Sequence, residues 1–127
     1  MAINIYDTVN QLAKELPQTE QYGNVKLAFA ALKNDLMAYN TYKKFMDLQA
    51  KMRTNQMTGQ QPNEDDLKQL ENLAKQMQDM KPVQSLMEAE QALNQLLNDI
   101  NSSLMKPIEN IYKDLGPSQP QQPNQSK

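Results

Sequence analysis

Hydrophobic residues recur at helical spacing along most of the chain, and the longest repeat lies between Pro82 and Tyr112. Steps of three and four residues form a seam on one side of a helix, made of Val83, Leu86, Glu90, Leu93, Leu97, Ile100 and Leu104. At about 100° per residue, Glu90, Asn94 and Asn101 fall along one polar edge of this seam. The wide apolar stripe predicts a central helix packed between neighbours inside the fold.

Local signals predict the ends of this helix. Asp79 is positioned to cap it, and Pro82 sits near its start, where a missing N–H costs little. Pro107 lies inside the pattern and removes a hydrogen bond to the preceding turn. We therefore expect a kink at Pro107, or a break into a short final helix.

Two helices are expected before Asp35. The first runs from about Ala2 to Leu16 and ends at Pro17, and its apolar face is Ile5, Val9, Leu12 and Leu16. Thr19 can cap the second. The apolar face of the second helix is Tyr22, Val25, Phe29 and Leu32.

A third helix is expected from a cap at Asp35 to about Met57, and its apolar positions cover more than half of the circumference. They are Met37, Ala38, Tyr39, Tyr42, Phe45, Met46, Leu48 and Met52. So wide an arc suits a helix that contacts its own fold on one side and a partner on the other. A second copy of the chain is the economical candidate.

A loop is expected over Thr58–Asn63, where Gly59 and Pro62 interrupt the helical pattern. Asn63 can cap a fourth helix, and a short loop between two long helices predicts an antiparallel hairpin. The chain after Leu115 has no apolar residue and is rich in Pro and Gln, which predicts a disordered tail. The expected fold is all-α: one domain of about five helices over residues 1–115, with a long hairpin and a long C-terminal helix, and a tail over 116–127.

The amino-acid composition narrows the range of possible functions. The net charge is −2, which gives no electrostatic basis for direct nucleic-acid binding. The chain has no His and no Cys, so His-based catalysis, thiol chemistry and most metal sites are excluded. No apolar run approaches about 20 residues, so no membrane insertion is expected. We expect a cytoplasmic protein with no catalytic or metal-ligating residue and no cofactor.

The candidate interaction or dimer residues lie on the two unusual helices. They are Tyr39, Tyr42, Phe45, Met46, Met52, Glu90, Asn94 and Asn101. The methionines suit either core packing or an adaptable binding surface. Glu90 either faces a partner and sets register, or is a partly exposed flank residue. The two tyrosines favour core or dimer packing over a ligand site.

Two long runs, Asn4–Leu16 and Leu86–Asn101 followed by Lys106-Pro107, resemble the YheA branch of the YlbF/YmcA-like bacterial proteins. Gln56–Gly59 and Tyr39–Leu48 also fit, so the likeness spans about residues 3–113. It implies an all-α fold, a long helical hairpin and a homodimer, typically in the cytoplasm of Firmicutes.

The resemblance also implies a regulatory setting. The YlbF and YmcA relatives act in a complex with a third protein, which affects competence, biofilm formation, sporulation and RNA processing through a membrane-anchored ribonuclease. Some relatives hold an iron–sulfur cluster with cysteines. This chain has none, so the cluster is not carried over.

Three hypotheses follow. The first is a non-enzymatic cytoplasmic dimer that acts as an adaptor or regulator, with a protein partner that the sequence does not identify. The second is a purely structural helical bundle that binds other helices without a regulatory role. The third is an enzyme that uses only carboxylates and lysines, with Glu88 or Glu90 as its first candidates.

Overall fold

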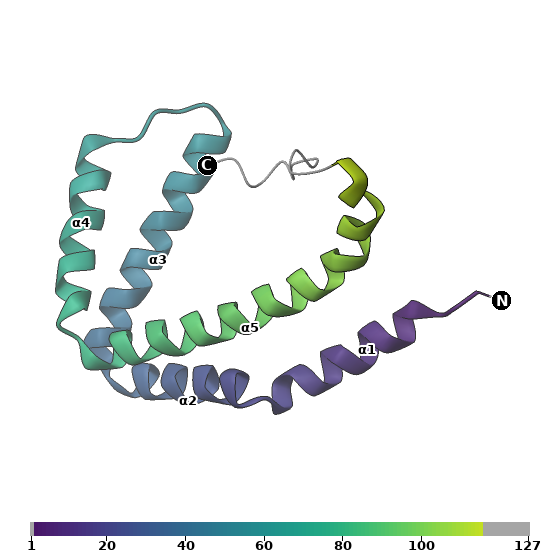
Figure 1. Cartoon of the computed structure of the whole chain (residues 1–127). Helices are drawn as coiled ribbons and strands as arrows, with labels where there is room; N and C mark the ends of the chain where they lie inside the picture. The colour runs from purple at the N-terminus through teal and green to yellow at the C-terminus, as the bar shows by residue number, and fades with distance from the viewer. Residues whose placement is uncertain (1, 116–127) are drawn as a thin grey trace. The chain divides into compact units, whose positions relative to one another are not determined.

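The computed structural model describes residues 2–115, and within that range the chain forms five α-helices and two short 3-10 turns (Figure 1). The helices are α1 (Ile5–Glu15), α2 (Glu20–Asn34), α3 (Leu36–Met57), α4 (Glu64–Gln78) and α5 (Lys81–Ile111), with 3-10 turns at Leu16–Gln18 and Lys113–Leu115. The predicted all-α class and helix count are confirmed. The predicted disordered tail, residues 116–127, lies outside the described residues.

Three predicted side-chain caps are present. Thr19 and Asp35 each accept a hydrogen bond at 3.2 Å from the backbone N–H three residues ahead, at the starts of α2 and α3. Asn63 accepts one at 2.8 Å from the N–H two residues ahead, at the start of α4. Each cap pairs a donor that the first helical turn leaves without an internal partner.

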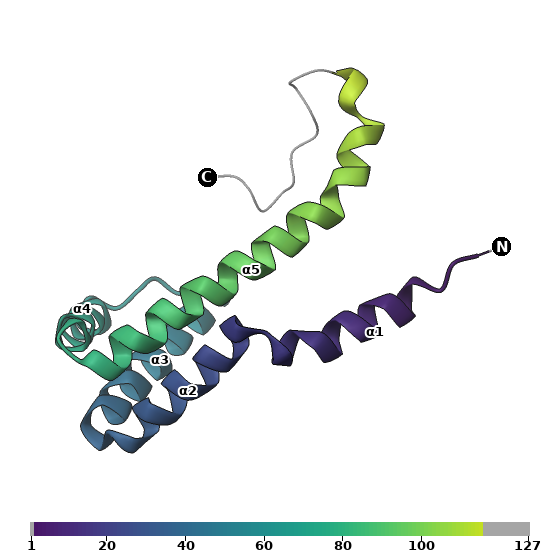
Figure 2. The same ribbon diagram turned by 60° about the horizontal axis from the view of Figure 1, so that its bottom comes forward.

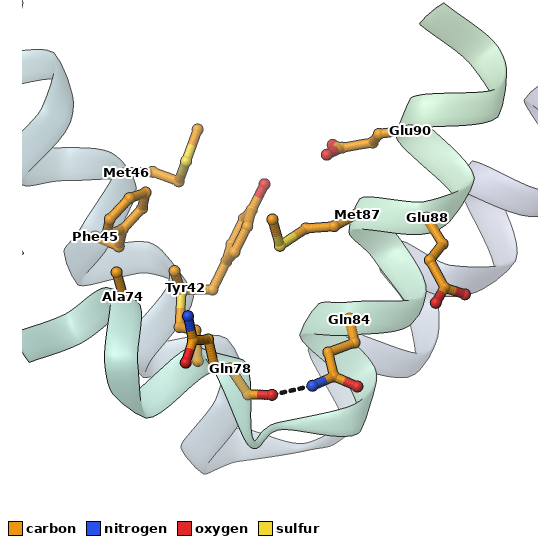
Figure 3. A pocket seen from close by; sticks show the side chains of 10 residues that line it. Tyr42, Phe45, Met46, Ala74, Gln78, Gln84, Met87, Glu88 and Glu90 are labelled. Carbon is orange, nitrogen blue, oxygen red and sulfur yellow. Dashed lines mark hydrogen bonds between the residues drawn. The ribbon is translucent and has the colours of Figure 1, made fainter. Parts of the chain in front are cut away.

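The predicted cap at Asp79 is wrong, because Asp79 closes α4 instead of opening α5. Its backbone N–H is directed at carbonyls of the last α4 turn, and the first hydrogen bonds of α5 go to the Met80 carbonyl. The Gln84 side chain donates to the Gln78 carbonyl across this connection (Figure 3). The turn is therefore too tight to leave Asp79 free as a cap for α5.

The hairpin of α3 and α4 is antiparallel, as predicted, and the two helices lie side by side in both views (Figures 1 and 2). Its loop follows Met57 and contains Gly59, which has a φ of +85°. The N–H of Gly59 donates to the Gln56 carbonyl and that of Gln60 to the Asn55 carbonyl, the two bonds of a Schellman motif. Glycine thus ends α3 in a left-handed conformation that side chains disfavour.

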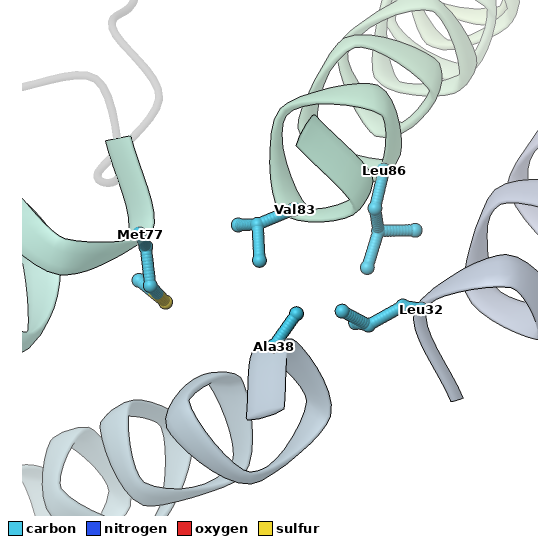
Figure 4. Packing of buried hydrophobic residues seen from close by; sticks show 5 residues of the cluster. All are labelled: Leu32, Ala38, Met77, Val83 and Leu86. Atoms are coloured by element: carbon cyan, nitrogen blue, oxygen red, sulfur yellow. The ribbon is translucent and has the colours of Figure 1, made fainter. Parts of the chain in front are cut away.

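The core lies where α2, α3, α4 and the first turns of α5 meet (Figure 4). Its buried side chains point toward one another, and they are Leu32, Ala38, Met77, Val83 and Leu86. Tyr39, Tyr42 and Phe45 are partly buried and pack against this cluster from α3. The core thereby fixes the positions of the side chains on one face of α3.

The chain divides into two compact units, one up to Leu93 and one from Asn94 onward, and each is described by itself. In α5, the buried residues are Val83 and Leu86, both in the first unit. In the second unit, Leu104 is 62% exposed, and Leu97 and Ile108 are also exposed. The prediction of a helix packed inside the fold along its length is therefore wrong for the single chain. A helical period specifies which face is apolar, but it does not supply a surface to cover that face.

The α-helix is not broken at Pro107 and continues to Ile111. Both views show the ribbon bending in its yellow-green part, within the second unit (Figures 1 and 2). A proline inside a helix removes one backbone donor and crowds the preceding turn, which accounts for a bend of this kind.

Candidate protein-interaction site

A groove of about 530 Å³ lies in the first unit between α3, α4 and the start of α5, and we call it the α3–α5 groove (Figure 3). Ten side chains line it: Tyr42, Phe45 and Met46 from α3, Ala74, Met77 and Gln78 from α4, and Gln84, Met87, Glu88 and Glu90 from α5.

Its apolar wall comes from one face of α3. Tyr42, Phe45 and Met46 are three and four residues apart, so they project from the same side of the helix. Tyr42 and Phe45 are partly buried because they also pack against the core, whereas Met46 and Met87 are exposed. The Tyr42 ring rises between Met46 and Met87 (Figure 3). Two aromatic rings that the core holds in place thus lie beside two flexible methionine side chains.

The edge formed by α5 is acidic. Glu90 is partly buried, and its carboxylate is turned toward the Tyr42 hydroxyl (Figure 3). Burial, and then the charge of Glu90, raises the pKa of Tyr42 above its ordinary value of 10.0. Glu88 and Glu90 are the acidic side chains among the ten described lining residues, which include no Lys or Arg. The groove is therefore apolar with one negative edge.

A second, shallower groove continues the apolar surface along the hairpin. It shares Phe45 and Ala74 with the α3–α5 groove, and it adds Leu67, Lys68, Leu70 and Glu71 from α4. Because Lys68 and Glu71 carry opposite charges, this end has no net charge. The negative charge is concentrated at the α5 end of the combined surface.

The structure brings four predicted residues together in the α3–α5 groove: Tyr42, Phe45, Met46 and Glu90. Tyr39 instead meets the edge of the Phe29 ring, with centroids 6.5 Å apart and planes at 82°.

The remaining predicted residues lie elsewhere. Met52 is partly buried on α3 outside the lining, and Asn94 and Asn101 belong to the second unit, where both are exposed.

Sequence reasoning missed part of the lining. Met87 follows Leu86 and so flanks the predicted α5 seam, and this position was a usable signal. Glu88 was named only as a candidate carboxylate of the enzyme hypothesis. Gln78 and Gln84 carried no signal, because polar residues near helix ends are common on any surface. They enter the groove through the tight connection between α4 and α5.

A different surface lies on α1. Its predicted apolar face is exposed, with Ile5 at 61% and Val9 at 52%, and no side chain of α1 is buried. The helix α1 packs against the 3-10 turn that follows it. This is an amphipathic helix whose apolar face is largely exposed.

Residues 2–115 contain neither a membrane-spanning helix nor a metal-binding cluster of side chains. None of the helices there combines the length and hydrophobicity that a bilayer crossing requires. No cluster of three or more His, Cys, Asp or Glu side chains is arranged to hold a metal ion in that part of the chain.

Comparison with known proteins gives consistent matches. The family described as "Control of competence regulator ComK, YlbF/YmcA" matches residues 5–109. A UPF0342 protein of Limosilactobacillus reuteri is 41% identical over 122 residues, covering 96% of this chain and 99% of the relative. A UPF0342 protein of Pediococcus pentosaceus is 37% identical over 114 residues, covering 90% and 100%.

A solved structure is also similar. It is described as a protein of unknown function (DUF964) from Bacillus stearothermophilus, with a TM-score of 0.79 and 22% identity, and the match covers 87% of this chain and 97% of that one. At this identity the likeness concerns the fold alone.

Proposed function

Because this chain belongs to the YlbF/YmcA family, we propose that it is a non-enzymatic cytoplasmic homodimer that serves as a protein-interaction adaptor or regulator. The family description points to control of the competence regulator ComK. The observation that carries the dimer is the exposed apolar face of α1.

A helix as short as α1 needs support. It has 11 residues, whereas an isolated helix below about 12–15 residues is marginal in water. Most helical stability in proteins comes from packing an apolar face, and no side chain of α1 is buried. A partner that covers the apolar face of α1 would stabilise this helix. A second copy is always available and can offer the same face in a two-fold arrangement.

The second unit offers another surface of the same kind. Leu97, Leu104 and Ile108 are exposed at helical spacing on α5. Association would remove these side chains from water, at about 25 cal/mol for each Å² of apolar surface. This supports a binding role for the second half of α5.

The residue types support binding over catalysis. The whole sequence lacks His and Cys, which serve most often as general bases and thiol nucleophiles. The groove joins aromatic rings and methionines to an acidic edge, a lining suited to protein contact.

Sedimentation equilibrium at micromolar concentration tests the dimer. The natural chain should sediment as a dimer, and Val9→Asp should shift it toward monomer because it places a charge on the apolar face of α1. Asn10→Asp is the matched control, because it adds the same charge at an exposed position beside that face. A monomeric natural chain, or a dimer indifferent to Val9→Asp, would remove the dimer from the proposal.

The second candidate is a purely structural bundle that binds other helices without a regulatory role. The same exposed apolar faces favour this candidate. Binding to other helices would cover these faces, and such binding need not regulate anything. Deleting the gene distinguishes the two. Altered competence or transcript processing supports the regulator, and unchanged levels of both support the bundle.

A further inference from the structure

We propose that the α3–α5 groove binds an amphipathic helix of a different protein, one that presents bulky apolar side chains to the wall and a Lys or Arg to Glu90. The inference rests on the proposed adaptor role and specifies the class of partner.

The shape of the surface fits a helix. The α3–α5 groove and the shallower groove share Phe45 and Ala74, so the apolar surface runs along α4 from Leu67 to Met77. At 1.5 Å per residue this stretch spans about 15 Å, roughly three helical turns. An amphipathic helix laid in such a groove places apolar side chains at steps of three and four residues along it.

The lining provides both fixed and adaptable contacts. Tyr42 and Phe45 pack against the buried core, so their rings are held before any partner arrives. Met46 and Met87 face each other across the Tyr42 ring and are exposed (Figure 3). Unbranched methionine side chains adjust to the bulk of an incoming residue, so this wall accepts Leu, Ile or Phe.

The charge of the groove selects the partner. Glu90 is partly buried beside apolar side chains, and within residues 2–115 it forms no ion pair. A carboxylate in such surroundings is stabilised by a cation, and Glu88 adds a second negative charge at the same end. A Lys or Arg flanking the apolar face of a bound helix meets this requirement.

The two largely exposed apolar faces of the chain, on α1 and in the second unit, do not complement this charge. The α1 helix carries Asp7 and Glu15 against Lys14. The described part of the second unit has one more acidic than basic residue, with Asp99, Glu109 and Asp114 against Lys106 and Lys113. Both segments are net negative and would meet a negative edge. A basic amphipathic helix of a separate protein fits the negative edge better than either of these segments.

Peptide display tests this directly. A library of 16-residue helix-forming peptides, with apolar positions at helical spacing and the other positions randomised, is selected on the full-length protein. The enriched peptides should carry Lys or Arg beside the apolar stripe. Fluorescence anisotropy should give binding that is weakened roughly tenfold by Glu90→Gln and by added salt. Glu109→Gln, which removes the same charge from an exposed position on α5, should leave binding unchanged.

Methionine methyl NMR locates the bound peptide. With ¹³C-methyl methionine, the signals of Met46, Met77 and Met87 should shift on peptide addition. The exposed Met37 and Met57 lie outside the lining and should not. Substituting each methionine by Leu assigns the signals.

Four outcomes would overturn the inference: no enriched peptide, enriched peptides without basic residues, binding indifferent to Glu90→Gln, or shifts confined to Met37 and Met57. Dissociation of the homodimer by the peptide would also count against it, because the groove would then hold a second copy. The dimer has its own test in Val9→Asp. A monomer that still binds basic helices would contradict the dimer and leave the groove intact.

Discussion

The carboxylate of Glu90 on α5 faces the hydroxyl of Tyr42 on α3 across the α3–α5 groove (Figure 3). The two residues belong to the separate helices that the sequence marked as unusual. Their electrostatic contact adds to burial in raising the pKa of Tyr42. The pKa of Tyr42 therefore depends on both the burial of its ring and the nearby charge of Glu90.

The raised pKa of Tyr42 predicts a loss of stability in alkali. Because the folded chain holds the phenol proton more tightly than the unfolded chain, this contribution is complete below about pH 10 and is lost as the pH rises through the folded pKa. Absorbance titration at 295 nm should show a late component that Tyr42→Phe removes. Thermal melts above pH 10 should depend less on pH in that variant.

Glu90→Gln should move the late Tyr42 component to lower pH but not to the ordinary value, because burial is the larger cause. Glu88→Gln is the control, since Glu88 makes no contribution to this shift. A titration unchanged by Glu90→Gln would contradict the placement of Glu90 beside Tyr42.

Leu86→Ala should destabilise the chain by about 2–5 kcal/mol, because Leu86 is 1% exposed and its loss leaves a cavity in the core. Leu27→Ala removes the same atoms from a side chain that is 72% exposed on α2, and it should change stability by less than about 0.5 kcal/mol. Urea unfolding at one fixed protein concentration measures both. Equal losses in the two variants would show that the core is misassigned.

Two glycine substitutions should act in opposite directions. At Gly59 the backbone is left-handed, so Gly59→Ala should cost about 1–2 kcal/mol. At Gly23, inside α2, an added Cβ has open space, and Gly23→Ala should stabilise by up to about 1 kcal/mol. Neither site has an atom within 4 Å of the new Cβ, so the contrast isolates backbone conformation. Changes of the same sign in the melting temperatures of the two variants would contradict this expectation.

The caps provide a further contrast. Asp35→Ala should cost about 1 kcal/mol, because its carboxylate accepts the Ala38 N–H at the start of α3, and Asp35→Asn should restore most of this. Asp79→Ala should change the free energy of unfolding by less than about 0.5 kcal/mol, since Asp79 closes α4 through its backbone. A large loss of stability in Asp79→Ala would show that the Asp79 side chain does cap α5.

Much of the local structure could be predicted from the sequence. The caps at Thr19, Asp35 and Asn63 and the loop after Met57 follow from hydrogen bonds and backbone conformations that involve only a few neighbouring residues. The α3 wall of the groove was also predictable, because helical geometry alone places Tyr42, Phe45 and Met46 on one face.

The coverage of each apolar face was decided only by the tertiary structure. Leu86 and Leu104 belong to the same seam of α5, yet one is buried in the core and the other is exposed. The same holds for α1, whose apolar face the sequence predicted and which has no buried side chain. A helical period is a local property of consecutive residues. Burial depends on how the turns direct distant segments toward one another, and that joining also places Glu90 opposite Tyr42 in one groove.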